Sequence, residues 1–254
     1  MPGARIVLLL SVWLAIILGA GAGARAATFD SAGVPIAYDV EGTGPPVILI
    51  HGLYASADLN WHRPGMTKRL AGRYQVIALD LRGHGRSGKP SEEGACGRET
   101  AEDVVRLMDH LGIAKAHVVG YSLGGMITMR LLADHPDRVR SGTLAGMGWL
   151  PEGSRLQAVW GHMLGPQRAS TPPACVRSMG ALAVTESAVR GITVPVEVIV
   201  GDRDPVKRMY VAPLARVRPD WRVVEIDEAG HLTCIVKPAF HDAVARWLDT
   251  NARR

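Results

Sequence analysis

Short runs of consecutive apolar residues recur along the chain, and they predict buried strands. A parallel strand that helices cover on both faces is apolar at nearly every position, unlike a strand with one wet face. We predict six such strands, over residues 47–50, 76–79, 116–119, 139–145, 196–200 and 221–226. Residues 29–40 predict two further short strands around a turn at Gly33.

Between these runs, apolar residues recur at helical spacing. The pattern predicts helices over 100–111, 122–133 and 236–248. Thr100 is a candidate N-cap, and Pro238 stands near the start of the third helix, where proline is tolerated. The alternation of strands and helices predicts an α/β fold with a mostly parallel sheet covered on both faces.

The segment 148–193 interrupts this alternation. It has no clear strand pattern and is rich in proline, glycine, alanine and methionine. Insertions of this length inside a compact domain usually serve a function. We therefore expect a small lid here, within a single domain that spans residues 27–254.

Residues 1–26 have the pattern of a secretory signal peptide. A basic start is followed by a short apolar run and by Ala24-Arg25-Ala26, a small-residue cleavage site. The run is short for a membrane span, which needs about 20 residues. We expect cleavage after Ala26, export to the periplasm or medium, and no stable membrane span afterwards.

Composition and charge exclude several function classes. The net charge is +5, or +3 without residues 1–26, and the basic residues are scattered rather than gathered into the stripe that nucleic acid requires. No H-E-x-x-H or paired C-x-x-C pattern indicates a metal. In an oxidising compartment, one disulfide could form and leave one thiol, and a bridge between Cys96 and Cys175 would hold the lid.

The strongest chemical signal is Gly120-Tyr121-Ser122-Leu123-Gly124, between a predicted strand and a predicted helix. A serine at such a sharp turn is pushed clear of the sheet, next to the positive end of the helix. Gly120 and Gly124 leave room where side chains would collide with backbone. The motif in this setting predicts a nucleophile elbow, with Ser122 as the nucleophile.

With these residues the chain resembles the α/β-hydrolase superfamily, in particular its serine esterase and lipase branch with a short lid. Further similar segments follow in the family's order: His51-Gly52-Leu53, the loop 80–87, Gly201-Asp202-Arg203-Asp204 and Gly230-His231. The resemblance spans roughly residues 28–250. It implies the α/β-hydrolase fold, in which helices lie on both faces of the sheet.

The resemblance also implies roles for individual residues. Ser122 would attack a carbonyl carbon, His231 would act as general base, and Asp204 would orient the imidazole. Asp202 is the second candidate for the acid. The backbone N–H groups of Leu53 and Leu123 would form the oxyanion hole.

Aromatic residues near these motifs are candidates for the substrate pocket: Tyr54, Trp61, Trp149 and Trp160. The tryptophans could equally fill the core. His51 and His84 are expected to be structural and to bond nearby backbone. Residues 83–88 fit G-x-G-x-x-G, but no helix opens there, so we expect no dinucleotide and no other cofactor.

We therefore expect a serine hydrolase that cleaves small-molecule carboxylic esters of small to medium acyl length through an acyl-enzyme. The same machinery could act as a thioesterase, a lactonase, a C–C hydrolase or a cofactor-free perhydrolase, since fold does not determine function. A binding protein on the same scaffold is a further alternative. A nucleic acid is not expected as a partner.

Overall fold

The computed structural model describes residues 25–162 and 170–252. The predicted signal peptide lies outside the described residues except for Arg25 and Ala26, which begin the first strand. None of the described helices is long and apolar enough to cross a membrane.

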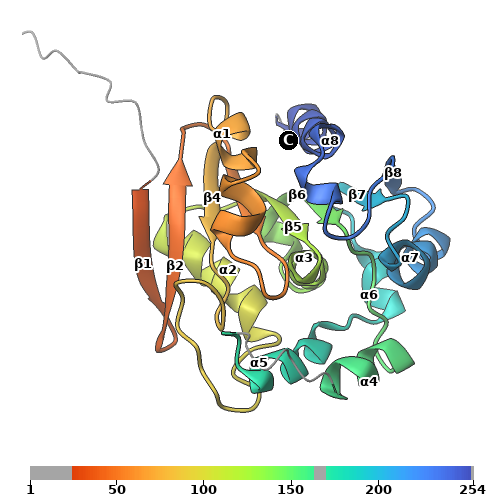
Figure 1. Cartoon of the computed structure of the whole chain (residues 1–254), viewed down its shortest axis with the longest axis horizontal. Helices are drawn as coiled ribbons and strands as arrows, with labels where there is room; N and C mark the ends of the chain where they lie inside the picture. Colours follow the sequence, from red (N-terminus) through yellow and green to blue (C-terminus); the bar gives the residue numbers. More distant parts are fainter. Residues whose placement is uncertain (1–24, 163–169, 253–254) are drawn as a thin grey trace, which may run out of the picture.

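A single eight-stranded sheet forms the centre of the molecule, in the order β1-β2-β4-β3-β5-β6-β7-β8 (Figure 1). β1 and β2 pair antiparallel with their neighbours, and all other pairs are parallel. The strands are β1 (Arg25–Ser31), β2 (Val34–Glu41), β3 (Pro46–Ile50), β4 (Gln75–Leu79), β5 (Ala116–Tyr121), β6 (Val139–Ala145), β7 (Val196–Gly201) and β8 (Arg222–Ile226).

All six predicted apolar runs form strands of the sheet. β3, β4, β5 and β7 have helices on both faces and bury nearly every side chain, which is why their sequences are continuously apolar. The N-terminal hairpin starts at Arg25, four residues earlier than the pattern predicted, since β1 pairs with β2 along its whole length. The predicted α/β-hydrolase fold is confirmed.

Helices cover both faces of the sheet. One core cluster lies under α2, α3, α6 and α7, and a second, separate cluster lies under α1 and α8. The helices are α1 (Met66–Leu70), α2 (Glu99–His110), α3 (Leu123–Asp134), α4 (Arg155–His162), α5 (Pro173–Ser178), α6 (Glu186–Gly191), α7 (Ala212–Val217) and α8 (Pro238–Asn251). Short helical turns add η1 (Asp58–His62), η2 (Pro136–Arg138), η3 (Met179–Leu182), η4 (Lys207–Val211) and η5 (Cys234–Val236).

Two predicted helix starts are wrong. Thr100 is not the N-cap of α2: the helix begins at Glu99, and the Thr100 hydroxyl donates to the Gly97 carbonyl, 2.6 Å away. The last helix begins at Pro238 rather than at Val236, because residues 234–236 form the separate turn η5. Proline at the first helical position loses no hydrogen bond there, so Pro238 favours this start.

The segment predicted to be a lid carries α4, α5, η3 and α6, which lie below the sheet's carboxyl edge in Figure 1. Among its described residues, Pro151 and Val184 form an isolated β-bridge. The indole N–H of Trp149 donates to the Val184 carbonyl at 2.7 Å and ties the two ends of the segment together. A disulfide joins Cys96, before α2, to Cys175 in α5.

Candidate active site

Ser122 lies in a sharp turn between β5 and α3, and its backbone is strained. Its φ of 53° and ψ of −115° lie in a region that residues other than glycine rarely adopt. The flanking glycines make the turn possible: a Cβ on Gly120 would lie 2.0 Å from the Gly124 carbonyl oxygen, and one on Gly124 would lie 2.1 Å from the Ile50 carbonyl oxygen. The turn thus requires glycine at both positions.

The structure brings Ser122, Asp204 and His231 together, although they lie far apart in sequence. Nε2 of His231 is 2.9 Å from Oγ of Ser122, and Nδ1 of His231 is 2.8 Å from Oδ2 of Asp204. The three residues follow the carboxyl ends of β5, β7 and β8 respectively. Since β5, β6, β7 and β8 run parallel in that order, their carboxyl ends lie at one edge of the sheet.

Asp204, not Asp202, faces the imidazole. The Asp204 side chain is buried, and its second oxygen accepts the Val206 N–H at 2.9 Å, which fixes the carboxylate. Asp202 instead accepts the Ala229 N–H at 2.9 Å, and this bond lowers the pKa of its carboxyl. Asp202 therefore shapes the loop before His231, as an aspartate in a turn commonly does.

The loop after β3 lies directly against the serine. A Cβ on Gly52 would be 3.2 Å from the Cβ of Ser122. The Gly52 N–H donates to Oδ1 of Asn60 at 2.8 Å, and the Gly52 carbonyl accepts from Ala55 N–H and from Nδ1 of His51. Because a trans peptide directs its carbonyl and N–H to opposite sides, these two donors leave the N–H of Leu53 on the opposite side of the peptide.

His51 and His84 both bond nearby backbone, as predicted. Nε2 of His51 accepts the Leu81 N–H at 3.0 Å, so its proton is on Nδ1, which donates to Gly52. Burial, followed by the neighbouring His84, lowers the pKa of His51 to about 3, so the ring stays neutral. Nδ1 of His84 bonds the Arg82 carbonyl, and burial lowers the pKa of His84 as well.

Leu123 opens α3 and is fully buried. The first N–H groups of a helix have no acceptor within the helix, so the Leu123 N–H is available beside Ser122. Leu53 is half-buried and packs against the core cluster under α3. Leu123 thus follows Ser122 in the chain, and Leu53 follows Gly52, whose backbone lies against Ser122.

The four predicted pocket residues differ in how deeply they are buried. Trp61 is fully buried among the residues under α1 and α8, so the prediction that it lines a pocket is wrong. Its η1 turn directs the indole into the core. Trp149 and Trp160 are also buried, within the other core cluster. Tyr54 stays half-exposed next to Leu53, with a left-handed φ of 59°, and burial raises the pKa of its hydroxyl.

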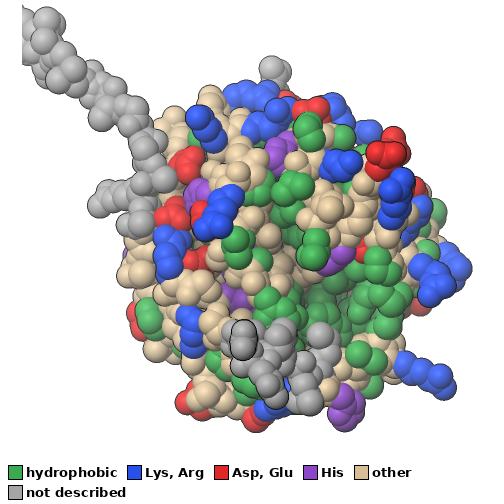
Figure 2. Space-filling model, in the orientation of Figure 1, with side chains coloured by type: hydrophobic (Ala, Val, Ile, Leu, Met, Phe, Trp, Pro, Cys, Tyr) green, Lys and Arg blue, Asp and Glu red, His purple; other side chains and the backbone are tan. Residues whose placement is uncertain are grey.

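Hydrophobic side chains gather in a hollow on the face shown in Figure 2, over the region where α3, α4 and α6 lie in Figure 1. Exposed apolar residues occur on the loops that carry the site. Leu232, next to His231, is 83% exposed, and Val236 follows on η5. The surroundings of the site are therefore apolar, as expected for binding a small organic substrate.

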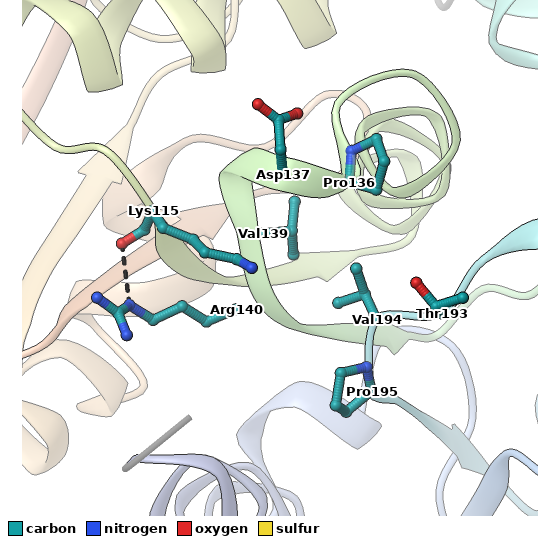
Figure 3. Close-up of a pocket in the computed structure, with 8 residues that line it drawn as sticks. All are labelled: Lys115, Pro136, Asp137, Val139, Arg140, Thr193, Val194 and Pro195. Atoms are coloured by element: carbon teal, nitrogen blue, oxygen red, sulfur yellow. Dashed lines mark hydrogen bonds between the residues drawn. The ribbon is translucent and has the colours of Figure 1, made fainter.

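A cavity of about 480 Å³ lies at the opposite edge of the sheet (Figure 3). It is lined at the amino ends of β5, β6 and β7, where Nε of Arg140 donates to the Lys115 carbonyl at 3.1 Å. Ligands of parallel sheets bind outside the carboxyl ends of the strands, so this cavity is not the substrate site. Within residues 25–162 and 170–252, no cluster of three metal-ligating side chains occurs.

Sequence reasoning missed two residues that the structure places at the site. Asn60 holds the Gly52 N–H, and the Tyr121 hydroxyl donates to the carbonyl of His231. Tyr121 lies inside the elbow motif, next to Ser122, so its position in the sequence already indicated that it lies near the site. Nothing in the sequence around Asn60 indicated its contact, because it depends on how η1 folds back over β3.

The fold and the Ser-His-Asp arrangement together define a protein of the α/β-hydrolase class. A family profile for the alpha/beta hydrolase fold matches residues 45–173, half of the chain. The chain therefore belongs to the α/β-hydrolase fold family.

Individual relatives are similar over part of their length. The chain is 37% identical over 141 residues to a putative carbamate hydrolase RutD of Azorhizobium caulinodans, covering 56% of this chain and 51% of that protein. It is 37% identical over 137 residues to the dihydrolipoyllysine-residue acetyltransferase component of an acetoin cleaving system of Pseudomonas putida, covering 53% and 35%. The matched region thus spans about a third to a half of these curated relatives.

Solved structures match over nearly the whole chain. A putative aryl esterase from Burkholderia cenocepacia superposes with a TM-score of 0.73 at 25% identity, covering 91% of this chain and 100% of that one.

Proposed function

We propose that this protein is a serine hydrolase that cleaves carboxylic esters of small to medium acyl chain. The hydrogen-bonded row from Ser122 through His231 to Asp204 is the observation that carries the proposal. A carboxylate that accepts from Nδ1 leaves the lone pair on Nε2 free, and that nitrogen lies within reach of the serine proton. A family relationship supports hydrolysis, and the likeness to a putative aryl esterase supports an ester as substrate.

The proposed reaction has two halves. Nε2 of His231 takes the proton of the Ser122 hydroxyl as Oγ bonds to the ester carbonyl carbon. The resulting oxyanion accepts from the N–H groups of Leu53 and Leu123. The C–O bond to the leaving alcohol breaks and His231 returns the proton to it, which leaves an acyl-serine. Water, deprotonated by His231, then releases the acid and restores the serine.

An assay with p-nitrophenyl acetate and butyrate tests this proposal. We expect Ser122→Ala to lose at least about 10³-fold in kcat, because removal of the nucleophile leaves only binding and oxyanion effects. Ser187→Ala, an exposed serine on α6, is the matched control and should retain full activity. Equal rates for Ser122→Ala and the unaltered protein would disprove the proposal.

The substrate range can be measured with the same protein. A series of p-nitrophenyl esters of increasing acyl length, together with a thioester and a lactone, would report which leaving group and acyl chain the site accepts. We expect the highest kcat/KM with a small or medium acyl ester. A clear preference for the thioester or the lactone would replace the ester in the proposal but keep the acyl-serine.

We also propose that the protein is exported. Residues 1–26 carry the signal-peptide pattern, and an oxidising compartment favours the Cys96–Cys175 disulfide. N-terminal sequencing of the protein recovered from the periplasm or the medium should begin at Ala27. Recovery of the full-length chain in the cytoplasm alone would contradict this.

A further inference from the structure

Tyr121 is the last residue of β5 and immediately precedes Ser122. Its side chain is 3% exposed and lies on the α8 side of the sheet. The ring packs edge-to-face against Phe240 of α8, with the ring centroids 5.8 Å apart. Gly146 makes room for it, since a Cβ there would lie 2.9 Å from Cζ of Tyr121. The ring is thus fixed from two sides.

The fixed ring directs its hydroxyl at the loop that carries His231. Oη of Tyr121 donates to the backbone carbonyl of His231, and the two rings lie 5.8 Å apart. Burial raises the pKa of Tyr121, so the hydroxyl keeps its proton and remains a donor across the neutral range. The bond therefore does not depend on pH where the enzyme would work.

Just before His231, the Ala229 N–H donates to Asp202 and the Ala229 carbonyl accepts the Arg203 N–H, which ties that end of the loop to the residues after β7. Gly230 N–H bonds Oγ1 of Thr233, and Cys234 N–H bonds the Gly230 carbonyl, so these bonds shape the loop internally. Leu232 projects into solvent. Among the described residues, the Tyr121 hydroxyl makes the hydrogen bond that ties the His231 backbone to the sheet.

We propose that Tyr121 is a positioning residue that keeps the general base in register with the nucleophile. This inference rests on the proposed serine hydrolase function. The backbone of Tyr121 leads directly into Ser122, while its side chain holds the carbonyl of His231. One residue therefore fixes both partners at the 2.9 Å separation between Oγ of Ser122 and Nε2 of His231. Small displacements of a base cost rate, because proton transfer requires hydrogen-bond distance.

Tyr121→Phe tests the inference, because it removes one oxygen atom and keeps the ring. We expect kcat on p-nitrophenyl acetate, normalised to titrated active sites, to fall about 10-fold with KM unchanged. The second-order rate of labelling by a fluorophosphonate should fall by a similar factor, since labelling also needs the serine–histidine pair.

Tyr74→Phe is the matched control. Tyr74 is 2% exposed on the same side of the sheet, and its hydroxyl donates to Asp249 at 2.8 Å, away from the His231 loop. We expect Tyr74→Phe to lower the free energy of unfolding by about as much as Tyr121→Phe does and to leave kcat unchanged. A normalised kcat of Tyr121→Phe within twofold of the unaltered protein, or an equal loss in Tyr74→Phe, would overturn the inference.

A second variant covers the case in which Tyr121→Phe does not fold. Phe240→Leu removes the edge-to-face partner of the ring, and we expect a smaller drop in normalised kcat with KM unchanged; no drop would overturn the inference. Failure of the serine hydrolase function can be told apart from failure of the positioning role of Tyr121. If the unaltered protein reacts with the fluorophosphonate no faster than Ser122→Ala, the serine hydrolase itself is disproved.

Discussion

His51 and Asn60 each form a hydrogen bond with the backbone of Gly52, and so fix the loop beside Ser122. The Asn60 carbonyl oxygen accepts the Gly52 N–H, and neutral His51 donates to the Gly52 carbonyl. Both bonds are to backbone, so neither side chain needs to touch a substrate to affect the rate. Charge placed at either position would lie close to the atoms where negative charge develops.

Asn60→Asp should therefore slow the reaction. The carboxylate can still accept the Gly52 N–H, so the loop geometry is kept, but its negative charge opposes the oxyanion of the transition state. We expect kcat to fall by roughly 10- to 100-fold with KM little changed, measured on p-nitrophenyl butyrate. Gln75→Glu, the same chemical change at the far end of β4, is the control and should leave kcat unchanged. A kcat of Asn60→Asp equal to that of the control would contradict this view of the loop.

At the scale of elements, the disulfide links two parts of the chain that the sheet does not connect. Cys96 and Cys175 have their Cα atoms 4.9 Å apart and lie 79 residues apart in sequence. An Arg177–Glu93 ion pair and a bond from Arg98 to the Ala181 carbonyl lie close by. Together these contacts hold α5 against the loop that leads into α2.

Removing the disulfide should destabilise the protein and loosen this contact. We expect Cys96→Ser/Cys175→Ser to unfold in urea with a free energy about 2–4 kcal/mol lower, because the unfolded chain regains the entropy of a long closed loop. Limited proteolysis should cut near α5 faster. A reductant should lower the free energy of unfolding of the unaltered protein by the same amount and leave that of the double variant unchanged. Identical urea midpoints for the two proteins would rule this out.

At the scale of the whole molecule, one buried acid gives stability a pH dependence. Glu197 lies in β7 and is 2% exposed, and burial raises its pKa to about 7. Arg222 lies 3.6 Å away and partly opposes this shift. Between pH of about 4.5 and 7, the folded state holds the proton more firmly than the unfolded chain does.

The free energy of unfolding should therefore fall as pH rises through this window. Above pH 7 the buried Glu197 carboxyl is ionised, and the full destabilisation is present. Glu197→Gln removes the titrating group, so we expect it to match the unaltered protein near pH 4. Near pH 8 it should be more stable by roughly 1–3 kcal/mol, since one pKa unit corresponds to about 1.4 kcal/mol. Urea unfolding at several pH values measures this. Glu225→Gln, a half-exposed acid on β8, is the control. Parallel pH curves for Glu197→Gln and the unaltered protein would refute the assignment.

The fold was largely predictable because its signals are local. Each buried parallel strand reads as an apolar run, and the elbow combines a strand end, two required glycines and a helix start within a few residues. Trp61 shows the limit of such reasoning. Its place beside a site motif suggested the pocket, yet the π-helical turn η1 rotates the indole into the core. Sequence distance does not specify which way a side chain turns.

By itself, the sequence determined the strand and helix order, the strained turn at Ser122 and the set of groups available to meet it, since these follow from short-range pattern and backbone sterics. Only the tertiary structure decided that Asp204 rather than Asp202 faces His231, that Cys96 pairs with Cys175, and that the Tyr121 hydroxyl donates to the His231 carbonyl. These contacts join residues 27 to 110 positions apart, and their geometry depends on strand register and helix packing over the whole sheet.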